Sequence, residues 1–63
     1  MTLEEAINKV CDHLHRGAII FTLYRAWEVN PQEFHVAVHA VMPFDRMLHF
    51  RVVQTWGVQE VNE

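Results

Sequence analysis

Apolar residues recur every three or four positions at the start of the chain, which is the spacing of one face of an α-helix. Thr2 followed by Glu5 matches a capping box, so the helix is expected to begin at Leu3. Arg16 suits the negative end of the helix dipole, and Gly17 is expected to end the helix in the left-handed conformation. The pattern predicts a helix over residues 3–16. Its apolar stripe comprises Leu3, Ala6, Ile7, Val10, Cys11 and Leu14.

Residues 18–29 are rich in β-branched and aromatic side chains, a composition typical of a strand. Side chains alternate between the two faces of a sheet along a strand. The alternation predicts that one group faces the helix: Ile19, Phe21, Leu23, Trp27 and Val29. The opposite face is expected to carry Ala18, Ile20, Thr22, Tyr24, Ala26 and Glu28, with Arg25 near the rim.

Two interpretations are open for residues 31–42. Asn30 and Pro31 can form a turn that leads into a strand, or they can cap and begin a helix. The three valines of this segment favour the strand, because β-branched side chains lose rotamer freedom in a helix. A helix over residues 31–42 remains the alternative.

The last third of the chain predicts one more strand. Residues 43–46 have the composition of a turn, and residues 47–56 alternate between apolar and polar side chains. Gly57 is expected to be a bulge or the end of that strand, and residues 58–63 to extend it or fray. The sequence therefore predicts the α+β class, with one N-terminal helix packed on a three-stranded antiparallel sheet in the order α-β-β-β. The alternative order is α-β-α-β. A chain of 63 residues is expected to form a single domain, residues 1–63.

One helix can cover only one face of such a sheet, so the other face is expected to be open. This face combines small and branched apolar residues with tyrosine, histidine and arginine, a composition that resembles protein interfaces. We expect it, or an exposed strand edge, to contact a partner protein or a second copy of the chain. The residues expected to anchor that contact are Tyr24, His39, His49, Arg51 and Val53.

Three histidines fall on the predicted open face. If His39 stands opposite His49 on the next strand, His35 lies on the same face, and neighbouring imidazoles could share a metal ion. A different register would place Arg51 opposite His39. No second cysteine or convergent carboxylate completes a tetrahedral set, so no metal site is predicted.

The charge balance weighs against a nucleic-acid backbone as the main ligand. The formal net charge is −3 with neutral histidines, and Lys9 is the single lysine, whereas phosphate-binding surfaces are normally basic. Binding of single-stranded nucleic acid on the tyrosine, histidine and arginine side chains of the sheet face is kept as the alternative function.

Signals for catalysis or export are lacking in the sequence. The chain has no serine, and its two glycines stand alone rather than in a phosphate-binding loop, so no enzyme and no cofactor are predicted. Cys11 is the single cysteine, which indicates a reducing compartment. With neither a signal peptide nor an apolar stretch of about 20 residues, the expected location is cytoplasmic, without membrane contact. The sequence thus predicts a small non-enzymatic interaction module, an inhibitor or adaptor, that self-associates.

Overall fold

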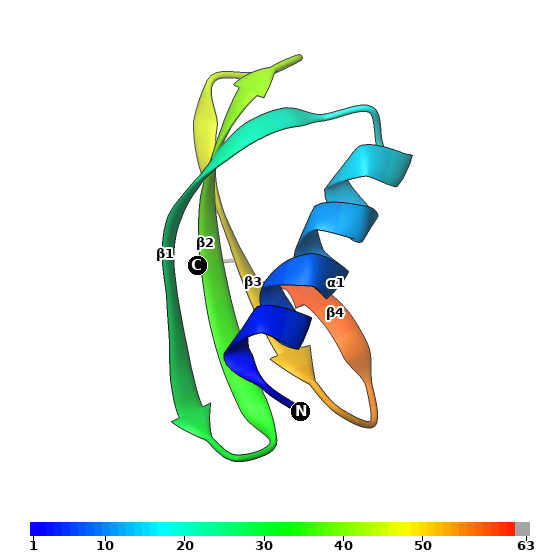
Figure 1. Cartoon of the computed structure of the whole chain (residues 1–63). Helices are drawn as coiled ribbons and strands as arrows, with labels where there is room; N and C mark the ends of the chain where they lie inside the picture. The colour runs from blue at the N-terminus through cyan, green and yellow to red at the C-terminus, as the bar shows by residue number, and fades with distance from the viewer. Residues whose placement is uncertain (62–63) are drawn as a thin grey trace.

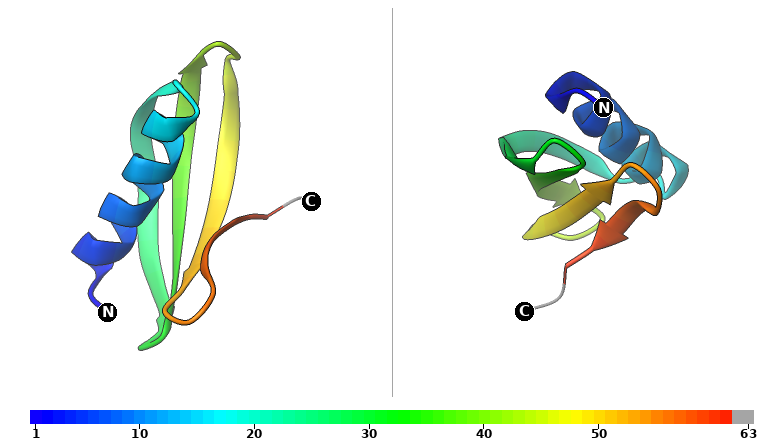
Figure 2. Two further views of the ribbon diagram at one scale, coloured as in Figure 1. Left: turned by 90° about the vertical axis from the view of Figure 1, so that its right-hand side faces the viewer. Right: turned by 90° about the horizontal axis from the view of Figure 1, so that it is seen from below.

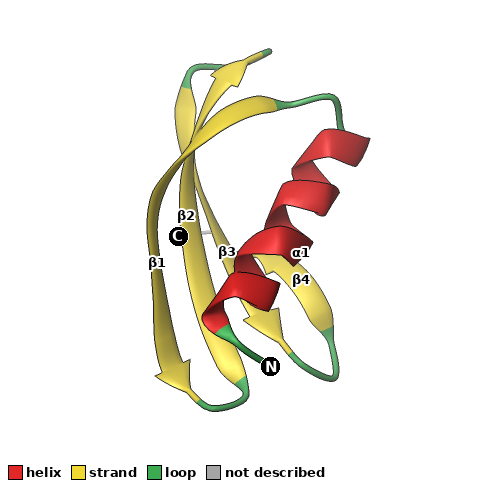
Figure 3. Cartoon of the chain, viewed as in Figure 1, coloured by secondary structure: helices red, strands yellow, loops and turns green. Residues whose placement is uncertain are grey.

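The computed structural model describes residues 1–61 and shows one helix packed on an antiparallel sheet. The elements are α1 (Leu3–Arg16), β1 (Ile20–Asn30), β2 (Glu33–Met42), β3 (Arg46–Val53) and β4 (Gly57–Glu60). Each strand pairs with the next one in the chain, so the sheet order is β1-β2-β3-β4 (Figures 1 and 3). The predicted α+β class is confirmed.

The prediction of three strands is wrong, because the chain turns back after Val53 and forms a fourth strand. The backbone N–H of Trp56 donates to the carbonyl of Val53 at 3.1 Å, and Gly57 adopts a positive φ of 77°. A positive φ carries no steric penalty at glycine, so Gly57 is suited to this tight reversal. The predicted third strand over residues 47–56 therefore ends early. Part of the expected extension, residues 62–63, lies outside the described residues.

Helix α1 begins as the capping box predicts and ends differently. The Thr2 hydroxyl accepts from the Glu5 N–H at 3.2 Å, and the Glu5 carboxylate accepts from the Thr2 N–H at 3.2 Å. The left-handed residue after the helix is Ala18, with φ 57°, and not Gly17, whose φ is −86°. The carbonyl of Leu14 accepts from Gly17 and from Ile19, so the last turn is closed before the chain reverses. At 14 residues, this helix is too short to cross a bilayer.

The core lies between α1 and one face of the two central strands. Strands β2 and β3 contribute seven of the ten buried hydrophobic residues, and α1 contributes the other three. These ten are Ala6, Val10, Leu14, Phe34, Val36, Val38, Ala40, Leu48, Phe50 and Val52. Figure 2 shows α1 against one side of the sheet, and none of the elements within residues 1–61 covers the other side.

Residues 33–42 form strand β2, so the strand interpretation is confirmed and the helical alternative is wrong. The turn before β2 is closed by the Asn30 side chain, whose Oδ1 accepts from the Gln32 N–H at 2.9 Å. An asparagine that bonds two residues ahead stabilises a turn rather than a helix start. Strand β2 then places every second residue in the core.

A β-bulge at Tyr24 reverses the two faces of β1 partway along the strand. Leu23 pairs with Val38 and Arg25 pairs with Ala37, so Tyr24 is the extra residue. An extra residue moves every later side chain to the opposite face. Beyond the bulge, Trp27 lies on the open face and Ala26 packs against the core, which reverses the predicted placement of both residues. Val29 lies at a second irregularity, between Glu28 and Asn30, and has no partner on β2. Strand β1 begins at Ile20, two residues later than predicted.

Leu23 pairs with the buried Val38, so it lies on the helix side of the sheet as predicted, but its side chain is half exposed. The bulge does not explain this exposure, because Leu23 precedes it. Leu23 lies on the outermost strand of the sheet. The fully buried side chains of the sheet all come from β2 and β3, so the closely packed core does not extend to this part of the edge strand.

The pairing of β2 with β3 is shifted by two residues from the prediction. His39 lies opposite Met47, and neither His49 nor Arg51 faces it. The hairpin loop spans residues 43–45, and the length of a hairpin loop sets the register of the strands that it joins. As a result, His35 lies opposite Arg51.

Candidate functional site

The centre of the open face holds five side chains from three strands, which we call the open-face cluster: Trp27, Glu33, His35, His49 and Arg51. His35 is the common neighbour, since it lies opposite Trp27 of β1 and opposite Arg51 of β3. His49 reaches His35 diagonally across β2 and β3. The cluster therefore depends on both the bulge in β1 and the register of the second hairpin.

A chain of hydrogen bonds links Glu33, His35 and His49. The Nε2 of His35 lies 2.8 Å from a Glu33 carboxylate oxygen, and its Nδ1 lies 2.7 Å from the Nε2 of His49. Because a carboxylate accepts, His35 donates from Nε2 and a single proton lies between the two rings.

Arg51 completes the cluster by pairing with Glu33. Its Nε lies 3.2 Å from one carboxylate oxygen, and its Nη2 donates to the other at 3.4 Å. The hydrogen bond from His35, followed by the contact with Arg51, lowers the pKa of Glu33 below the ordinary carboxyl value of 4.5, against the opposing effect of burial. The side chains of His35 and Glu33 are only 17% and 22% exposed. Glu33 is thus a partly buried carboxylate held by two basic neighbours.

Trp27 packs against both histidine rings. Its ring centroid lies 5.3 Å from that of His35 and 5.4 Å from that of His49, distances typical of aromatic pairs. The guanidinium of Arg25 lies 4.6 Å from the Trp27 centroid, within the range of a cation–π contact. The cluster is therefore an ordered platform of aromatic and charged groups.

The structure divides the five predicted anchors among different places. His49 and Arg51 belong to the open-face cluster, and Val53 lies beside it, opposite Glu33. Tyr24 stands at the bulge of β1 and is 71% exposed. His39 instead forms a hydrogen bond with Asp45 near the β2–β3 turn.

The sequence prediction missed Trp27 and Glu33 as members of the cluster. Alternation placed Trp27 on the helix side, and no residue pattern marks the bulge that moves it. Glu33 was not among the residues predicted for the open face, although it is the first residue of β2. The open face of β2 was itself a usable signal, because Glu33 and His35 share it by simple alternation.

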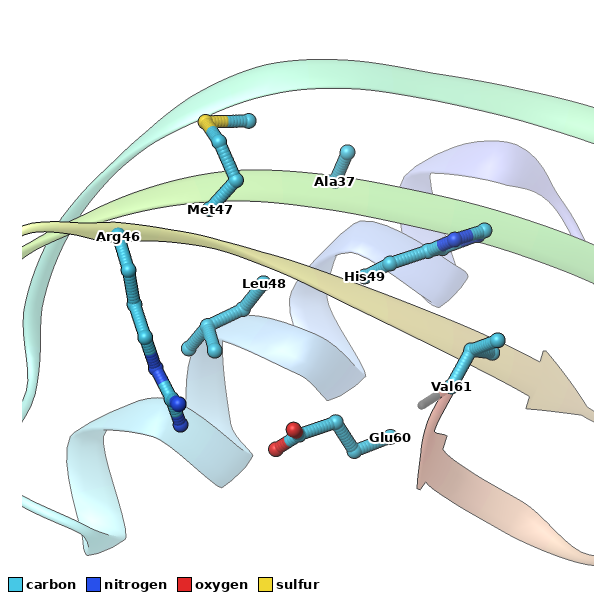
Figure 4. A pocket seen from close by; sticks show the side chains of 7 residues that line it. All are labelled: Ala37, Arg46, Met47, Leu48, His49, Glu60 and Val61. Atoms are coloured by element: carbon cyan, nitrogen blue, oxygen red, sulfur yellow. The ribbon is translucent and has the colours of Figure 1, made fainter. Parts of the chain in front are cut away.

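The open face offers no evident metal site within residues 1–61, where no group of three or more histidine, cysteine or acidic side chains is suitably placed. A hollow of about 350 Å³ lies beside His49, where β4 leaves part of β3 uncovered (Figure 4). In Figure 4 the polar ends of Arg46 and Glu60 turn toward the same end of this hollow. The hollow is open to solvent, so it does not enclose a ligand.

Large apolar side chains are exposed in two neighbouring regions of the sheet. The first, the β1 edge, comprises Ile20, Leu23, Tyr24 and Val29. The second, the hairpin end, comprises Val41, Met42, Phe44 and Met47 at the β2–β3 turn. Ile20 pairs with Met42, so the two regions adjoin.

A groove of about 440 Å³ separates the end of α1 from the β2–β3 hairpin, and we call it the helix–hairpin groove. Its lining is mainly apolar and includes Leu14, Ile19, Leu48, Phe50, Pro43 and Phe44. Its charged or ionisable lining residues are His13, Arg16, Arg46 and Glu60. Both arginines make no ion pair with any residue in the described part of the chain.

The chain has no match among protein-family models, curated proteins or solved structures. Its function is therefore inferred from the surfaces described above.

Proposed function

We propose that this chain is a small, non-enzymatic protein-interaction module that acts through the exposed apolar surface of its sheet. This proposal rests on the number of apolar side chains that the fold leaves exposed. Residues 1–61 expose ten large hydrophobic side chains, as many as the ten hydrophobic residues that they bury in the core. Nine of the ten exposed side chains lie on the sheet or its turns. Exposed apolar side chains that lie together typically mark contact sites, whereas isolated ones do not.

The β1 edge offers a mechanism for binding. Strand β1 has 11 residues and lies at the edge of the sheet, where backbone groups can pair with an added strand. Edge strands are commonly protected by lysine or proline, and β1 contains neither; its charged residues are Arg25 and Glu28. The Tyr24 bulge divides the edge, so a partner segment would pair with one of two short stretches.

Site-specific photo-crosslinking in the source cells tests this proposal. A photo-reactive amino acid in place of Tyr24 is expected to capture a discrete protein, either a second copy or another chain. The same group in place of Lys9, exposed on α1, is the matched control and is expected to capture none. Leu23→Lys should reduce the capture from position 24, because a charge is placed on the binding edge. Equal capture from both positions, or none from position 24, would contradict the proposal.

Binding of single-stranded nucleic acid is a second candidate, and one observation favours it. The guanidinium of Arg25 lies over Trp27, and that of Arg51 lies 5.9 Å from the ring centroid of the exposed Trp56. Aromatic rings with arginines on an open sheet face can stack bases. The net charge of −3 weighs against this function. Unchanged mobility of a labelled single strand at low salt would eliminate it.

A further inference from the structure

The β2–β3 hairpin forms a convex apolar end of the molecule. In Figures 1 and 2 the hairpin extends beyond the last turn of α1. Phe44 at the turn is 61% exposed, and Met42 and Met47 on either side of it are more than half exposed. Methionine side chains are flexible and adapt to irregular apolar surfaces.

The concave counterpart lies directly beside this convex end. The helix–hairpin groove has a buried apolar floor that includes Leu14 and Phe50, and its volume of about 440 Å³ exceeds that of a phenylalanine side chain. Pro43 and Phe44 form part of the groove wall. A two-fold axis close to this wall would allow the hairpin end of each copy to cover the groove of the other.

The charges of the two surfaces are complementary. Asp45 at the hairpin turn has a side chain that is 81% exposed, and its one charged or ionisable contact within residues 1–61 is His39. The groove is lined by Arg16 and Arg46 and by one acidic residue, Glu60. Arg46 directly follows Asp45 in the same hairpin, so Arg16 at the end of α1 is the groove arginine that Asp45 of a second copy would meet.

We propose that the partner of the hairpin end is a second copy of this chain, with each hairpin end seated in the helix–hairpin groove of the other copy. This inference rests on the proposed interaction function and names one partner for it. A standard interface buries roughly 800 Å² of surface on each partner. The hairpin end exposes four large apolar side chains, and their surface is smaller than that. The dimer is therefore expected to be weak and to form as concentration rises.

Sedimentation velocity over a range of concentrations measures this association directly. The wild-type mass is expected to rise from 7.5 kDa toward twice that value. Phe44→Ala should weaken the dimer about tenfold or more, since it removes the central apolar contact. Circular dichroism checks that this exposed substitution leaves the fold intact. Tyr24→Ala, on the β1 edge, is the matched control and should leave the mass profile unchanged.

A charge exchange tests the pairing of the two surfaces. Asp45→Arg and Arg16→Asp should each weaken the dimer, and the double variant should recover most of the wild-type association. His39→Gln removes the contact that Asp45 makes within one copy, and the dimer should persist. A double variant no better than the single variants would overturn the proposed docking.

The outcomes also separate this inference from the proposed function. A mass of 7.5 kDa at every concentration overturns the dimer, while crosslinks from position 24 to another protein would still support an interaction module. A dimer that Tyr24→Ala dissociates and Phe44→Ala leaves intact would place self-association at the β1 edge. That result overturns the inference and supports the proposed function.

Discussion

Trp27 and the two histidines that it contacts form the aromatic centre of the open-face cluster. The charged groups beside the two imidazoles are Glu33 and Arg51, and the guanidinium of Arg25 lies over the Trp27 ring. Helix α1 packs on the opposite face of the sheet. Since the Trp27 ring is in contact with both imidazoles, its emission reports on whether both rings are in place.

We therefore expect the fluorescence of Trp27 to depend on the histidine pair. In a Trp56→Phe background, Trp27 is the single tryptophan of the chain. At a fixed neutral pH, His49→Gln should change the intensity or the wavelength of its emission, because the substitution removes an imidazole ring whose centroid lies 5.4 Å from that of Trp27. His39→Gln serves as the control, because His39 contacts Asp45 away from Trp27. Emission that His39→Gln alters and His49→Gln leaves unchanged would rule out this assignment.

At this scale, the sequence predicts which residue types occupy the open face better than it predicts their contacts. His49 and Arg51 were expected to act as anchors, and both belong to the open-face cluster. Their neighbours could not be predicted, because a shift of two residues between β2 and β3 replaces every partner while keeping each side chain on its face. Trp27 was misplaced for a different reason, the bulge at Tyr24.

Among the elements, α1 was the most predictable and β1 the least. The ends of α1 depend on local signals, and the contact between Thr2 and Glu5 confirms the start. The faces of β1 depend on whether Tyr24 is paired, which is decided by the neighbouring strand and leaves no mark in the alternation. Strand β4 was missed because the residues of the preceding turn, Thr55 and Trp56, are also common in strands.

The bulge leads to a prediction about deletions in β1. Removal of Tyr24 preserves every pairing on both sides, since Leu23 and Arg25 already face consecutive residues of β2. Its unfolding free energy should stay within about 1 kcal/mol of the wild-type value. Removal of Ala26 instead forces either Arg25 or Trp27 toward the core, at an expected cost of at least about 2 kcal/mol.

Urea unfolding of the two deletion variants measures this difference. Both variants lack one residue from the same strand, so each serves as the control for the other. Trp27 fluorescence should remain sensitive to His49→Gln in the Tyr24 deletion, because Trp27 stays opposite His35. If the Tyr24 deletion is the less stable of the two, the extra residue is required for the pairing of β1 rather than being a removable insertion.

For the molecule as a whole, the two faces of the sheet are stabilised by different interactions. One face is held by the apolar core under α1, while the other is held in part by the polar contacts of Glu33 with His35 and Arg51. The sequence predicts this division, since alternation in β2 and β3 separates apolar from polar side chains. Its consequence is that acid should weaken one face of the sheet while leaving the apolar core unchanged.

The pH dependence of folding stability follows from the lowered pKa of Glu33. The hydrogen bond from His35 and the contact with Arg51 favour the ionised carboxylate in the folded protein, so its folded pKa lies below the ordinary value of 4.5. The stabilisation from this group is fully present above the unfolded pKa and is lost as the pH falls through the folded pKa. Glu33→Gln should therefore reduce the unfolding free energy near neutral pH and have a smaller effect in acid.

Urea unfolding of the wild type and of Glu33→Gln from neutral pH to below pH 4.5 tests this expectation. The two stability curves should converge as the pH falls, because the wild type loses the same ion-pair contacts that the variant already lacks. Glu28→Gln is the matched control on the neighbouring strand, since Glu28 forms no ion pair within residues 1–61. Its curve should run parallel to that of the wild type. Parallel curves for Glu33→Gln as well would mean that the contacts of Glu33 with His35 and Arg51 do not make the folding stability depend on pH.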